Sequence, residues 1–256
     1  MISRAMRWLT AGLAVACTYV AILLPAGAQT PAGKSNETPT ADQVLKRYLQ
    51  AEGGRAAFEK LTSRVMTGTI RVPAMSLSGT VEVREKAPDR SLATITINGA
   101  SFRQGFDGTK GWTDDPENGL RDQSGAELAE SRRESDFYHT LDLAKLYLNF
   151  TVAGKEKIGD NQAYLIEAAV PEGGPPEKMY FDTKSGLLLR TTSQHHGPDG
   201  VGELQQDYED YRQVDGIQLP HTIRQTNEGT LVIITVAEYH HNVQLDDADF
   251  AKPAAR

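Results

Sequence analysis

The sequence predicts a mainly β protein of the α+β class, built on one strongly curved, antiparallel sheet of about eleven strands. Three observations lead to this prediction. Apolar and polar residues alternate with a period of two over most of residues 64–241, turn signals separate the alternating segments, and helical periodicity is confined to two short blocks. Sequential strands joined by tight turns form antiparallel meanders, and a long sheet twists and curls.

Residues 1–28 have the three parts of a secretory signal peptide. Arg4 and Arg7 give a charged start, residues 9–24 are almost entirely apolar, and Ala26-Gly27-Ala28 provides a small-residue cleavage site. We therefore expect a cleaved signal peptide and a periplasmic protein. An uncleaved membrane anchor is the alternative, because the apolar stretch approaches the length of a membrane span.

Cleavage after residue 28 leaves 228 residues, enough for one domain with its own core. The sole cysteine, Cys17, leaves with the signal peptide, so the mature chain has no disulfide, thiolate nucleophile or sulfur metal ligand. Lipidation of Cys17 is not expected, because residue 14 is Ala where a lipoprotein signal has Leu. The mature chain carries 25 basic and 34 acidic residues, and this net charge of −9 argues against nucleic acid and anionic lipid surfaces as partners.

The first elements of the mature chain are predicted to be helical. Thr40 and Gln43 form a capping-box pattern, and apolar residues at helical spacing follow as far as Gly53. A second, shorter helix is expected over residues 55–61. The expected division of the chain is a signal peptide (1–28), a flexible tether (29–39), a single domain (40–250) and a C-terminal tail (251–256).

Two runs of alternating segments predict the strands, each apolar on one side and polar on the other. The first run comprises residues 64–72, 76–86, 92–98 and 101–108, with a tight hairpin at 106–112 returning through Trp112. The second run comprises residues 150–158, 162–170, 177–182, 186–193, 203–213, 217–226 and 230–241.

A helical block, residues 124–147, separates the two runs and is expected to break near His139. Ser124 and Glu127 form a second capping-box pattern at its start. The apolar side of a sheet has to be covered, and the helices are too few to cover eleven strands. We therefore predict a concave, apolar and partly open hollow.

Four segments carry a family resemblance. They are VLKRYLQAEGGRAAFEKLTSRVMTGTI, the hairpins GFDGTKGW and YFDTKSGLLLR, and the closing pair YRQVDGIQLPHTIRQ. Together they resemble the LolA/LolB-like proteins, periplasmic outer-membrane lipoprotein carriers and lipoprotein-sorting proteins, over residues 42–245. The resemblance implies an eleven-stranded, unclosed half-barrel, capped by helices, that holds acyl chains in an apolar cavity. The chain lacks the lipidated N-terminal cysteine of the family's membrane-anchored acceptors, and the arginine that gates the carrier's cavity has no assignable counterpart.

Strand parity predicts which side chains face the hollow. In MYFDTKSGLLLR, Met179 and Phe181 share one side of the incoming strand, Leu187 and Leu189 share one side of the outgoing strand, and Leu188 points away. Such side chains either pack as core or line a ligand cavity, and flexible or flat apolar groups suit a cavity. The predicted ligand-binding residues are Met66, Ile70, Val81, Val83, Ile95, Phe102, Phe106, Trp112, Met179, Phe181, Leu187, Leu189 and His221.

The histidines show no metal-binding pattern. Adjacent residues of a strand face opposite sides, so neither His195-His196 nor His240-His241 is expected to chelate through both rings. No HExxH or HxH spacing occurs, and a zinc site built from distant strands is the alternative. His195 and His196 precede a GPDG loop and are expected to be solvated. His221 is expected to be a hydrogen-bonded core residue, or else a contact for a ligand headgroup.

The sequence contains no GxSxG, GxGxxG, P-loop or CxxCH motif, so we expect no enzyme activity, no cofactor and no metal. Most arginines of the first run are expected to protect sheet edges, and one at the cavity mouth would pair with a lipid phosphate or carboxylate. These arginines are Arg64, Arg71, Arg84, Arg90 and Arg103.

The predicted function is that of a periplasmic carrier that shelters acyl chains of a lipid or lipoprotein, without catalysis. A membrane-bound donor or acceptor protein would be its partner. The alternative is a non-catalytic protein-interaction or stress-sensing module on the same fold, with a filled interior. The volume and lining of the hollow distinguish the two hypotheses.

Overall fold

The computed structural model describes residues 38–197 and 200–254. The predicted signal peptide and nearly all of the predicted tether lie outside the described residues, as does the end of the predicted tail. No helix in the described part of the chain is both long enough and apolar enough to cross a membrane.

A single antiparallel sheet of thirteen strands forms the framework, and it is not closed. The first run of strands is β1 (Ser63–Val72), β2 (Leu77–Lys86), β3 (Arg90–Ile97), β4 (Ala100–Phe106), β5 (Gly111–Asp115) and β6 (Gly119–Asp122). The second run is β7 (Asn149–Ile158), β8 (Asn161–Ala169), β9 (Glu177–Asp182), β10 (Leu188–Gly197), β11 (Gly200–Val214), β12 (Ile217–Asn227) and β13 (Thr230–His241).

Each run is a meander, and the two runs join where β1 pairs with β13. The strand order is therefore β6 to β1 followed by β13 to β7, with β6 and β7 at the two ends of the sheet. The prediction of eleven strands is wrong by two. The additional strands are β5 and β6, whose sequences GWTDD and GLRD are too short and too polar to show an alternating pattern.

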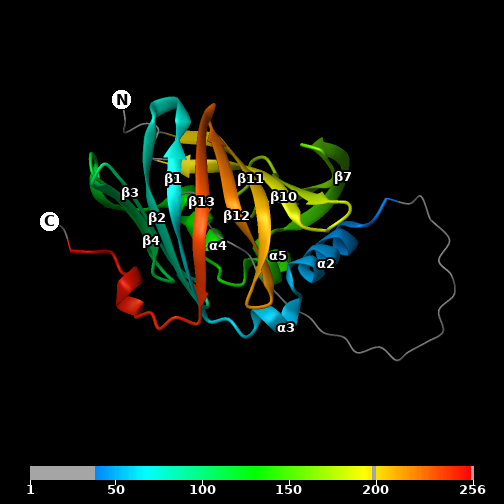
Figure 1. The fold of residues 1–256 in the computed structure, drawn as a ribbon, viewed down its shortest axis with the longest axis horizontal. Helices are drawn as coiled ribbons and strands as arrows, with labels where there is room; N and C mark the ends of the chain where they lie inside the picture. Colours follow the sequence, from blue (N-terminus) through cyan, green and yellow to red (C-terminus); the bar gives the residue numbers. More distant parts are fainter. Residues whose placement is uncertain (1–37, 198–199, 255–256) are drawn as a thin grey trace.

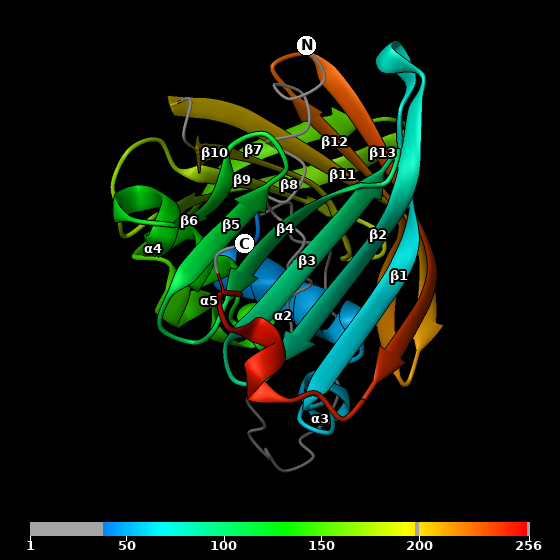
Figure 2. The same ribbon diagram turned by 90° about the vertical axis from the view of Figure 1, so that its left-hand side faces the viewer.

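The sheet curves strongly, and the helices α2 (Ala41–Glu52), α4 (Gly125–Glu134) and α5 (His139–Leu146) lie on its concave side (Figures 1 and 2). The short α3 (Arg55–Phe58) follows α2, and two 3-10 turns complete the fold, η1 (Pro73–Met75) and η2 (Asp247–Phe250). In Figure 2, α4 lies between the first-run strands β5 and β6 and the second-run strand β10. This helix therefore spans the two halves of the curved sheet.

The helix boundaries follow the predicted signals in two cases out of three. The Thr40–Gln43 capping box at the start of α2 is confirmed by both of its hydrogen bonds. The predicted break near His139 is also confirmed, since α5 begins there. The second capping box is wrong, because Ser124 makes no side-chain cap and Glu127 instead binds Arg121 on β6.

The core is divided between the two halves of the sheet. A first cluster fills the concave side of the first run and of β12 and β13, with Phe58, Leu61 and Phe137 packed against the strands. A second, smaller cluster joins α2 and α5 to β8 and β9 through Val44, Leu143 and neighbouring side chains. Buried apolar side chains therefore pack densely on the concave side of the first half of the sheet.

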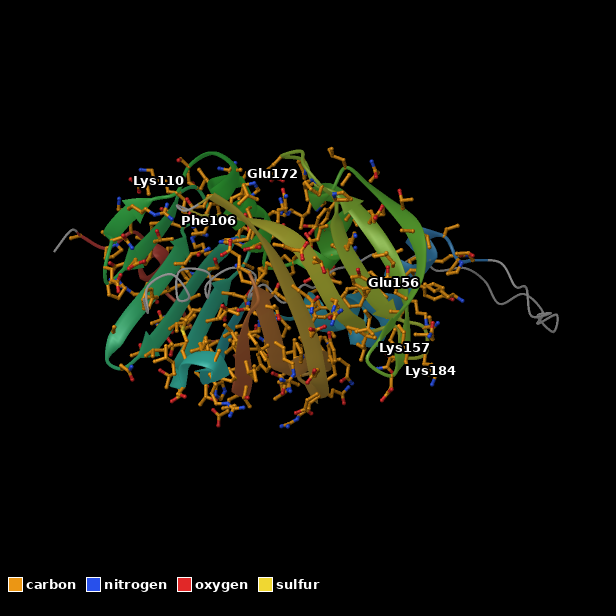
Figure 3. All side chains as sticks on the ribbon, turned by 90° about the horizontal axis from the view of Figure 1, so that it is seen from above. Phe106, Lys110, Glu156, Lys157, Glu172 and Lys184 are labelled. Atoms are coloured by element: carbon orange, nitrogen blue, oxygen red, sulfur yellow. The ribbon has the colours of Figure 1, made fainter. Side chains whose placement is uncertain are left out.

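The end strand β7 carries charged side chains into solvent. Lys155, Glu156 and Lys157 are all exposed, and Figure 3 shows Glu156 and Lys157 on the outer side of the molecule. Charges on an end strand discourage pairing with the edge of another sheet. The five arginines of the first run lie on β1 to β4, and none of these is an end strand, so the prediction that most of them protect sheet edges is wrong.

Candidate ligand-binding pocket

A pocket lies on the concave side of the second run, beneath α2, α4 and α5. It contains about 770 Å³ of space between atoms, including its open mouth, and about 70 Å³ of it can be reached by the centres of water molecules. The smaller volume has room for only a few water molecules. The lining residues are Tyr48, Glu52, Arg133, Glu134, His139, Leu143, Tyr147, Glu177, Met179, Phe181, Leu188, Thr191, Ser193, Gln206, Tyr208, Tyr211 and Pro220.

One wall of the pocket is apolar. Leu143 from α5, Met179 and Phe181 from β9, and Leu188 from β10 all belong to or pack against the second core cluster. The ring of Tyr48 lies 4.9 Å from the ring of Phe181, centroid to centroid, and extends this wall onto α2. A hydrocarbon group entering the pocket would therefore contact several apolar side chains.

Glu52 provides the most deeply buried carboxyl group of the pocket, being only 2% exposed. Tyr48 lies one helical turn earlier on α2 and donates its hydroxyl to Glu52 Oε1 at 2.8 Å. Thr140 of α5 donates to Glu52 Oε2 at 3.3 Å. Burial raises the pKa of Glu52 to about 8, and the hydrogen bonds from Tyr48 and Thr140 only partly counteract it. The carboxyl group is therefore mostly protonated at neutral pH.

Two more carboxyl groups line the pocket. Burial raises the pKa of Glu134 to about 8, with Glu130 adding to the effect. Burial also raises the pKa of Glu177, which accepts a hydrogen bond from the Tyr147 hydroxyl at 2.6 Å. Three acids from α2, α4 and β9 thus surround one small space.

Arg133 on α4 supplies the cationic side chain among the described lining residues. Its guanidinium binds Glu172 at 2.6 Å and lies 5.6 Å from the centre of the Tyr147 ring. Burial lowers the pKa of Arg133, but the fields of Tyr147, Glu177 and Glu172 outweigh burial and raise it. The charge of Arg133 is therefore already matched by the protein's own anions.

His139 at the start of α5 completes the polar lining. Burial, aided by the charge of Arg133, lowers the pKa of His139 to about 3, so its ring is neutral at physiological pH. The Nδ1 atom is shielded from solvent and has no hydrogen-bond partner among the described residues. The ring edge meets Tyr147, with 6.0 Å between centroids. A neutral imidazole without a partner is an available polar group at the pocket wall.

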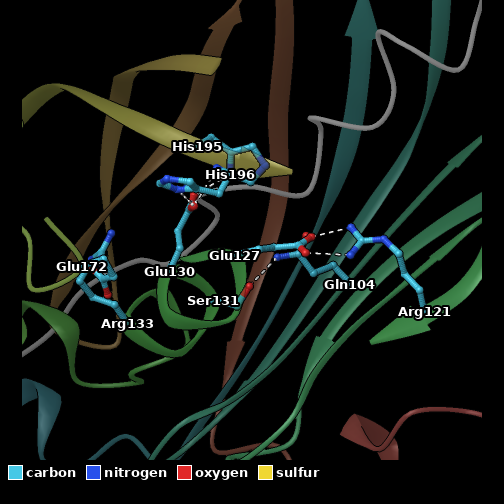
Figure 4. A network of polar contacts seen from close by, with 9 residues as sticks. All are labelled: Gln104, Arg121, Glu127, Glu130, Ser131, Arg133, Glu172, His195 and His196. Carbon is cyan, nitrogen blue, oxygen red and sulfur yellow. Dashed lines mark hydrogen bonds and ion pairs between the residues drawn. The ribbon is translucent and has the colours of Figure 1, made fainter. Parts of the chain in front are cut away.

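Polar contacts hold α4 across the two halves of the sheet (Figure 4). Toward the first run, Glu127 binds Arg121 of β6 through both carboxylate oxygens, and Gln104 of β4 donates to Ser131 at 3.4 Å. Toward the second run, Glu130 binds two histidines of β10, and Arg133 binds Glu172 in the segment between β8 and β9. We call these contacts the α4 clasp.

The two histidines of the clasp correct the sequence prediction. His195 Nδ1 donates to Glu130 Oε1 at 2.6 Å, and His196 approaches Glu130 Oε2 through its backbone nitrogen at 2.9 Å and through Nδ1 at 3.1 Å. His195 is buried and His196 partly buried, so the expectation that both are solvated is wrong. His196 lies near the β10–β11 turn. Its backbone nitrogen and its ring both contact the Glu130 carboxylate, which His195 also binds.

The structure divides the predicted ligand-binding residues into several groups. Met179 and Phe181 line the pocket. The largest group lies packed in the first core cluster, away from the pocket: Met66, Ile70, Val81, Val83, Ile95 and Phe102. Phe106 and Trp112 are buried, and the Trp112 indole donates to the Phe250 carbonyl at 2.8 Å. The part that these residues play in ligand binding stays a prediction.

The three leucines after the β9–β10 turn do not face the sides that strand alternation predicts. Leu188 lines the pocket, whereas Leu189 packs in a third cluster with Leu165 and Tyr180, and Leu187 is partly buried in the turn itself. The expectation that Leu188 points away is wrong, because the β9–β10 pairing shifts register between Leu188 and Arg190.

His221 is a hydrogen-bonded core histidine, the first of its two predicted roles. It is buried, its Nδ1 donates to the Leu219 carbonyl at 3.1 Å, and its ring meets Tyr239 edge-on. Neighbouring Pro220 lines the pocket. In residues 38–197 and 200–254, no three side chains of His, Cys, Asp or Glu are placed to hold a metal ion.

The five arginines of the first run do not line the pocket. Arg64 is 1% exposed and binds Glu85 at 2.6 Å inside the protein, so its predicted role as an edge charge is wrong. Arg84, Arg90 and Arg103 form ion pairs with Glu82, Asp247 and Asp114 respectively. Arg71 is exposed on β1. The arginine that lines the pocket, Arg133, lies in the helical block of residues 124–147. The sequence predicted only that this block covers the apolar side of the sheet.

Sequence reasoning missed the polar part of the pocket because its members come from distant segments. One local signal was available: Tyr48 and Glu52 stand four residues apart on a predicted helix, where their side chains meet on one face. Glu134, His139 and Glu177 have no such pattern. Their proximity depends on how α4, α5 and β9 fold together.

The fold matches solved structures over most of the chain, at low sequence identity. A LolA superfamily protein from Nitrosomonas europaea has a TM-score of 0.56 and 13% identity, over 84% of this chain and 99% of the other. A DUF1329 family protein from Desulfovibrio piger has a TM-score of 0.55 and 14% identity, over 84% and 98%. A domain described as an outer membrane lipoprotein-sorting protein, from Vibrio parahaemolyticus, has a TM-score of 0.52 and 14% identity, over 82% and 95%.

No protein-family model matches the chain, and no curated protein matches it either. At identities of 13% to 14% the structural matches establish the fold and nothing finer. The predicted LolA/LolB-like fold is confirmed: one unclosed antiparallel sheet with a few helices on its concave side.

Proposed function

We propose that this protein is an exported carrier that binds the apolar part of a lipid or lipoprotein in the pocket beneath α2, α4 and α5. The observation that carries the proposal is the pocket itself. It lies on the concave side of the sheet, has an apolar wall of Leu143, Met179, Phe181 and Leu188, and is not filled by the protein's own side chains. The proposed activity is sheltering and release, without a chemical step.

The size of the pocket sets a condition on this function. Room for a few water molecules is far less than a long acyl chain occupies, so such a ligand fits only if the pocket enlarges. Each methylene group that is then buried contributes about 0.8 kcal/mol, from which the cost of ordering the chain is subtracted. The ligand can supply the free energy needed to move a covering element.

The covering element suited to this movement is α4. Its buried residues are Glu130, Ser131 and Arg133, all polar, and the clasp holds it by hydrogen bonds and ion pairs. Moving a helix of this kind exposes little apolar surface, and water replaces the broken polar contacts at modest net cost. In the proposed cycle, α4 moves away when a ligand enters and returns when the pocket empties.

The proposed location is the periplasm, reached through the signal peptide predicted over residues 1–28. A membrane-bound donor or acceptor protein would load or unload the carrier. The fold match to a LolA superfamily protein supports a carrier of this kind.

The test is lipid analysis of the protein purified from a membrane-containing host, followed by titration with a fluorescent acyl probe. We expect co-purified lipid and saturable probe binding that the extracted lipid reverses. Absence of both contradicts the proposal.

A second candidate function is a non-catalytic protein-interaction or stress-sensing module. The tightly filled first core cluster favours it, because a filled interior leaves the exposed surface as the working part. This function predicts a periplasmic crosslinking partner whose binding is unaffected by acyl ligands. Competition between partner and acyl probe would support the carrier instead.

A further inference from the structure

The pocket has an excess of hydrogen-bond acceptors and acids over cations. Glu52, Glu134 and Glu177 line it from three elements, while Arg133 is matched by Glu172 at 2.6 Å. Acids are almost never fully buried without a partner of opposite charge. Glu52 is the sharpest case, because it is 2% exposed and its hydrogen-bond donors, Tyr48 and Thr140, are neutral hydroxyls.

A second feature of the same pocket also indicates a missing donor. The ring of His139 is neutral, and its buried Nδ1 has no hydrogen-bond partner among the described residues. A neutral imidazole has one nitrogen that accepts a hydrogen bond. The side chains of His139 and Glu52 both line this pocket.

Aromatic side chains line the pocket together with these acceptors. Tyr48, Tyr147, Tyr208 and Tyr211 all line the pocket. An aromatic face attracts a cation, and several faces around one space form the cage that binds organic ammonium groups. The tyrosine hydroxyls are already engaged, for example that of Tyr211 with the Leu188 carbonyl at 2.7 Å. The Tyr147 ring already lies 5.6 Å from the Arg133 guanidinium, so the other three rings are the ones available to a further cation.

From these features we infer that the pocket recognises an organic ammonium group, with Glu52 as its counter-ion and His139 as a further acceptor. An ammonium group has hydrogen donors and no acceptor, which suits a wall of carboxylates and a neutral imidazole. An anionic headgroup would meet three acids and one arginine that is already paired. The inference rests on the proposed carrier function and names the headgroup that the carrier would select.

The size of the pocket agrees with this assignment. Space for a few water molecules suits an ammonium group with a short alkyl stem, without any movement of the helices. A longer chain attached to the stem would then lie along Met179, Phe181 and Leu188 once α4 has moved. The same chemistry can come from a free amine or from an amine-bearing lipid.

The protonation of Glu52 provides a specific signature. Its carboxyl group is mostly protonated at pH 7 in the empty pocket, with Tyr48, Tyr211 and Arg64 as the titratable or charged groups that act on it. A bound ammonium favours the carboxylate, so binding should expel the proton into solvent. An uncharged ligand of the same shape should expel none.

The experiment is calorimetric titration of the purified full-length protein at pH 7 in two buffers of different ionisation enthalpy. The ligands are dodecylammonium, dodecanol, dodecanoate and butylammonium, each below its micelle concentration. The proteins are wild type, Glu52→Gln and the matched control Glu156→Gln, whose side chain is exposed on β7. Dodecanol binding shows whether Glu52→Gln keeps a functional pocket.

We expect dodecylammonium to bind wild type at least tenfold more tightly than dodecanol or dodecanoate, with release of about one proton from Glu52. Glu52→Gln should lose that preference and the proton that Glu52 contributes to the release, while Glu156→Gln behaves as wild type. Binding of butylammonium alone would support the ammonium site, assign it to free amines and contradict the carrier function. Equal binding of dodecylammonium and dodecanol overturns the inference and leaves the carrier function standing, whereas no binding by any of the four ligands overturns both.

Discussion

Glu130 on α4 and His195 on β10 form a hydrogen bond of 2.6 Å although 65 residues separate them in the sequence. Both residues are buried, at 4% and 7% exposure. His196 adds two contacts to the second oxygen of the same carboxylate. The pair therefore fastens the helix that covers the pocket to the second run of strands, and it does so with groups that titrate.

The stability contribution of this pair is predicted to depend on pH. Burial raises the pKa of Glu130, but hydrogen bonds from His195 and His196 outweigh burial and lower it, so its contribution is lost as pH falls through the lowered value. Burial lowers the pKa of His195, but Glu130 outweighs burial and raises it, so that contribution is lost as pH rises through the raised value. The pair contributes fully between the ordinary values of about 4.5 and 6.5.

The variant Glu130→Gln should therefore lose about 2 kcal/mol of unfolding free energy near pH 5.5 and progressively less above pH 7. Urea unfolding of wild type and variant across pH 4 to 9 measures the difference. The control is His240→Gln, which removes an exposed pair with Glu238 and should change stability by less than about 0.5 kcal/mol. A difference that stays constant over the whole pH range would contradict the assignment.

Arg64 and Glu85 form a second buried pair, at 1% and 7% side-chain exposure, with 2.6 Å between Nε and Oε2. Arg64→Met should destabilise the fold by about 3–5 kcal/mol, because Glu85 is left buried without its cation. The double variant Arg64→Met/Glu85→Leu should recover most of this loss. Chemical unfolding measures both, and a double variant no more stable than the single one would show that packing, rather than the orphaned charge, causes the loss.

The exposed pair Arg224–Glu209 is the matched control for this experiment. Its side chains are 40% and 49% exposed, and the Arg224 Nε lies 3.0 Å from Glu209 Oε1. Arg224→Met should cost less than about 1 kcal/mol, because solvent screens the charges.

Adjacent leucines on β10 separate ligand binding from stability. Leu188 lines the pocket, and Leu189 packs in the third cluster with Leu165 and Tyr180. Leu188→Ala should weaken acyl-probe binding about fivefold, because the bound probe loses apolar contact equivalent to at least one buried methylene group. Leu189→Ala should leave probe affinity unchanged while lowering the unfolding midpoint. Equal effects of the two substitutions on probe affinity would argue against the pocket as the binding site.

The sequence was sufficient for the antiparallel sheet, because strands such as β3 and β12 alternate between buried and more exposed positions over most of their length. It was insufficient for β5 and β6, which are short and polar. It also failed at Leu188, because a register shift reverses the parity of the strand, and no sequence pattern marks that shift.

The position of the hollow could not be predicted either. Met66 and Met179 are both 3% exposed and both occupy alternating strands, yet Met66 packs in the first core cluster and Met179 lines the pocket. Periodicity identifies the concave side of the sheet but not which part of that side the helices fill. The acids of the pocket could not be predicted for a related reason. Glu52, Glu134 and Glu177 lie around one pocket only because α2, α4 and β9 pack together.

The two methionines also provide the most direct test of where a ligand binds. We propose NMR spectra of protein labelled with ¹³C in the methionine methyl groups, recorded during titration with dodecylammonium. We predict that the Met179 methyl signal shifts progressively to saturation while the Met66 signal stays in place. A shift of Met66 with Met179 unchanged would place the ligand in the first half of the sheet and contradict binding in the pocket beneath α2, α4 and α5.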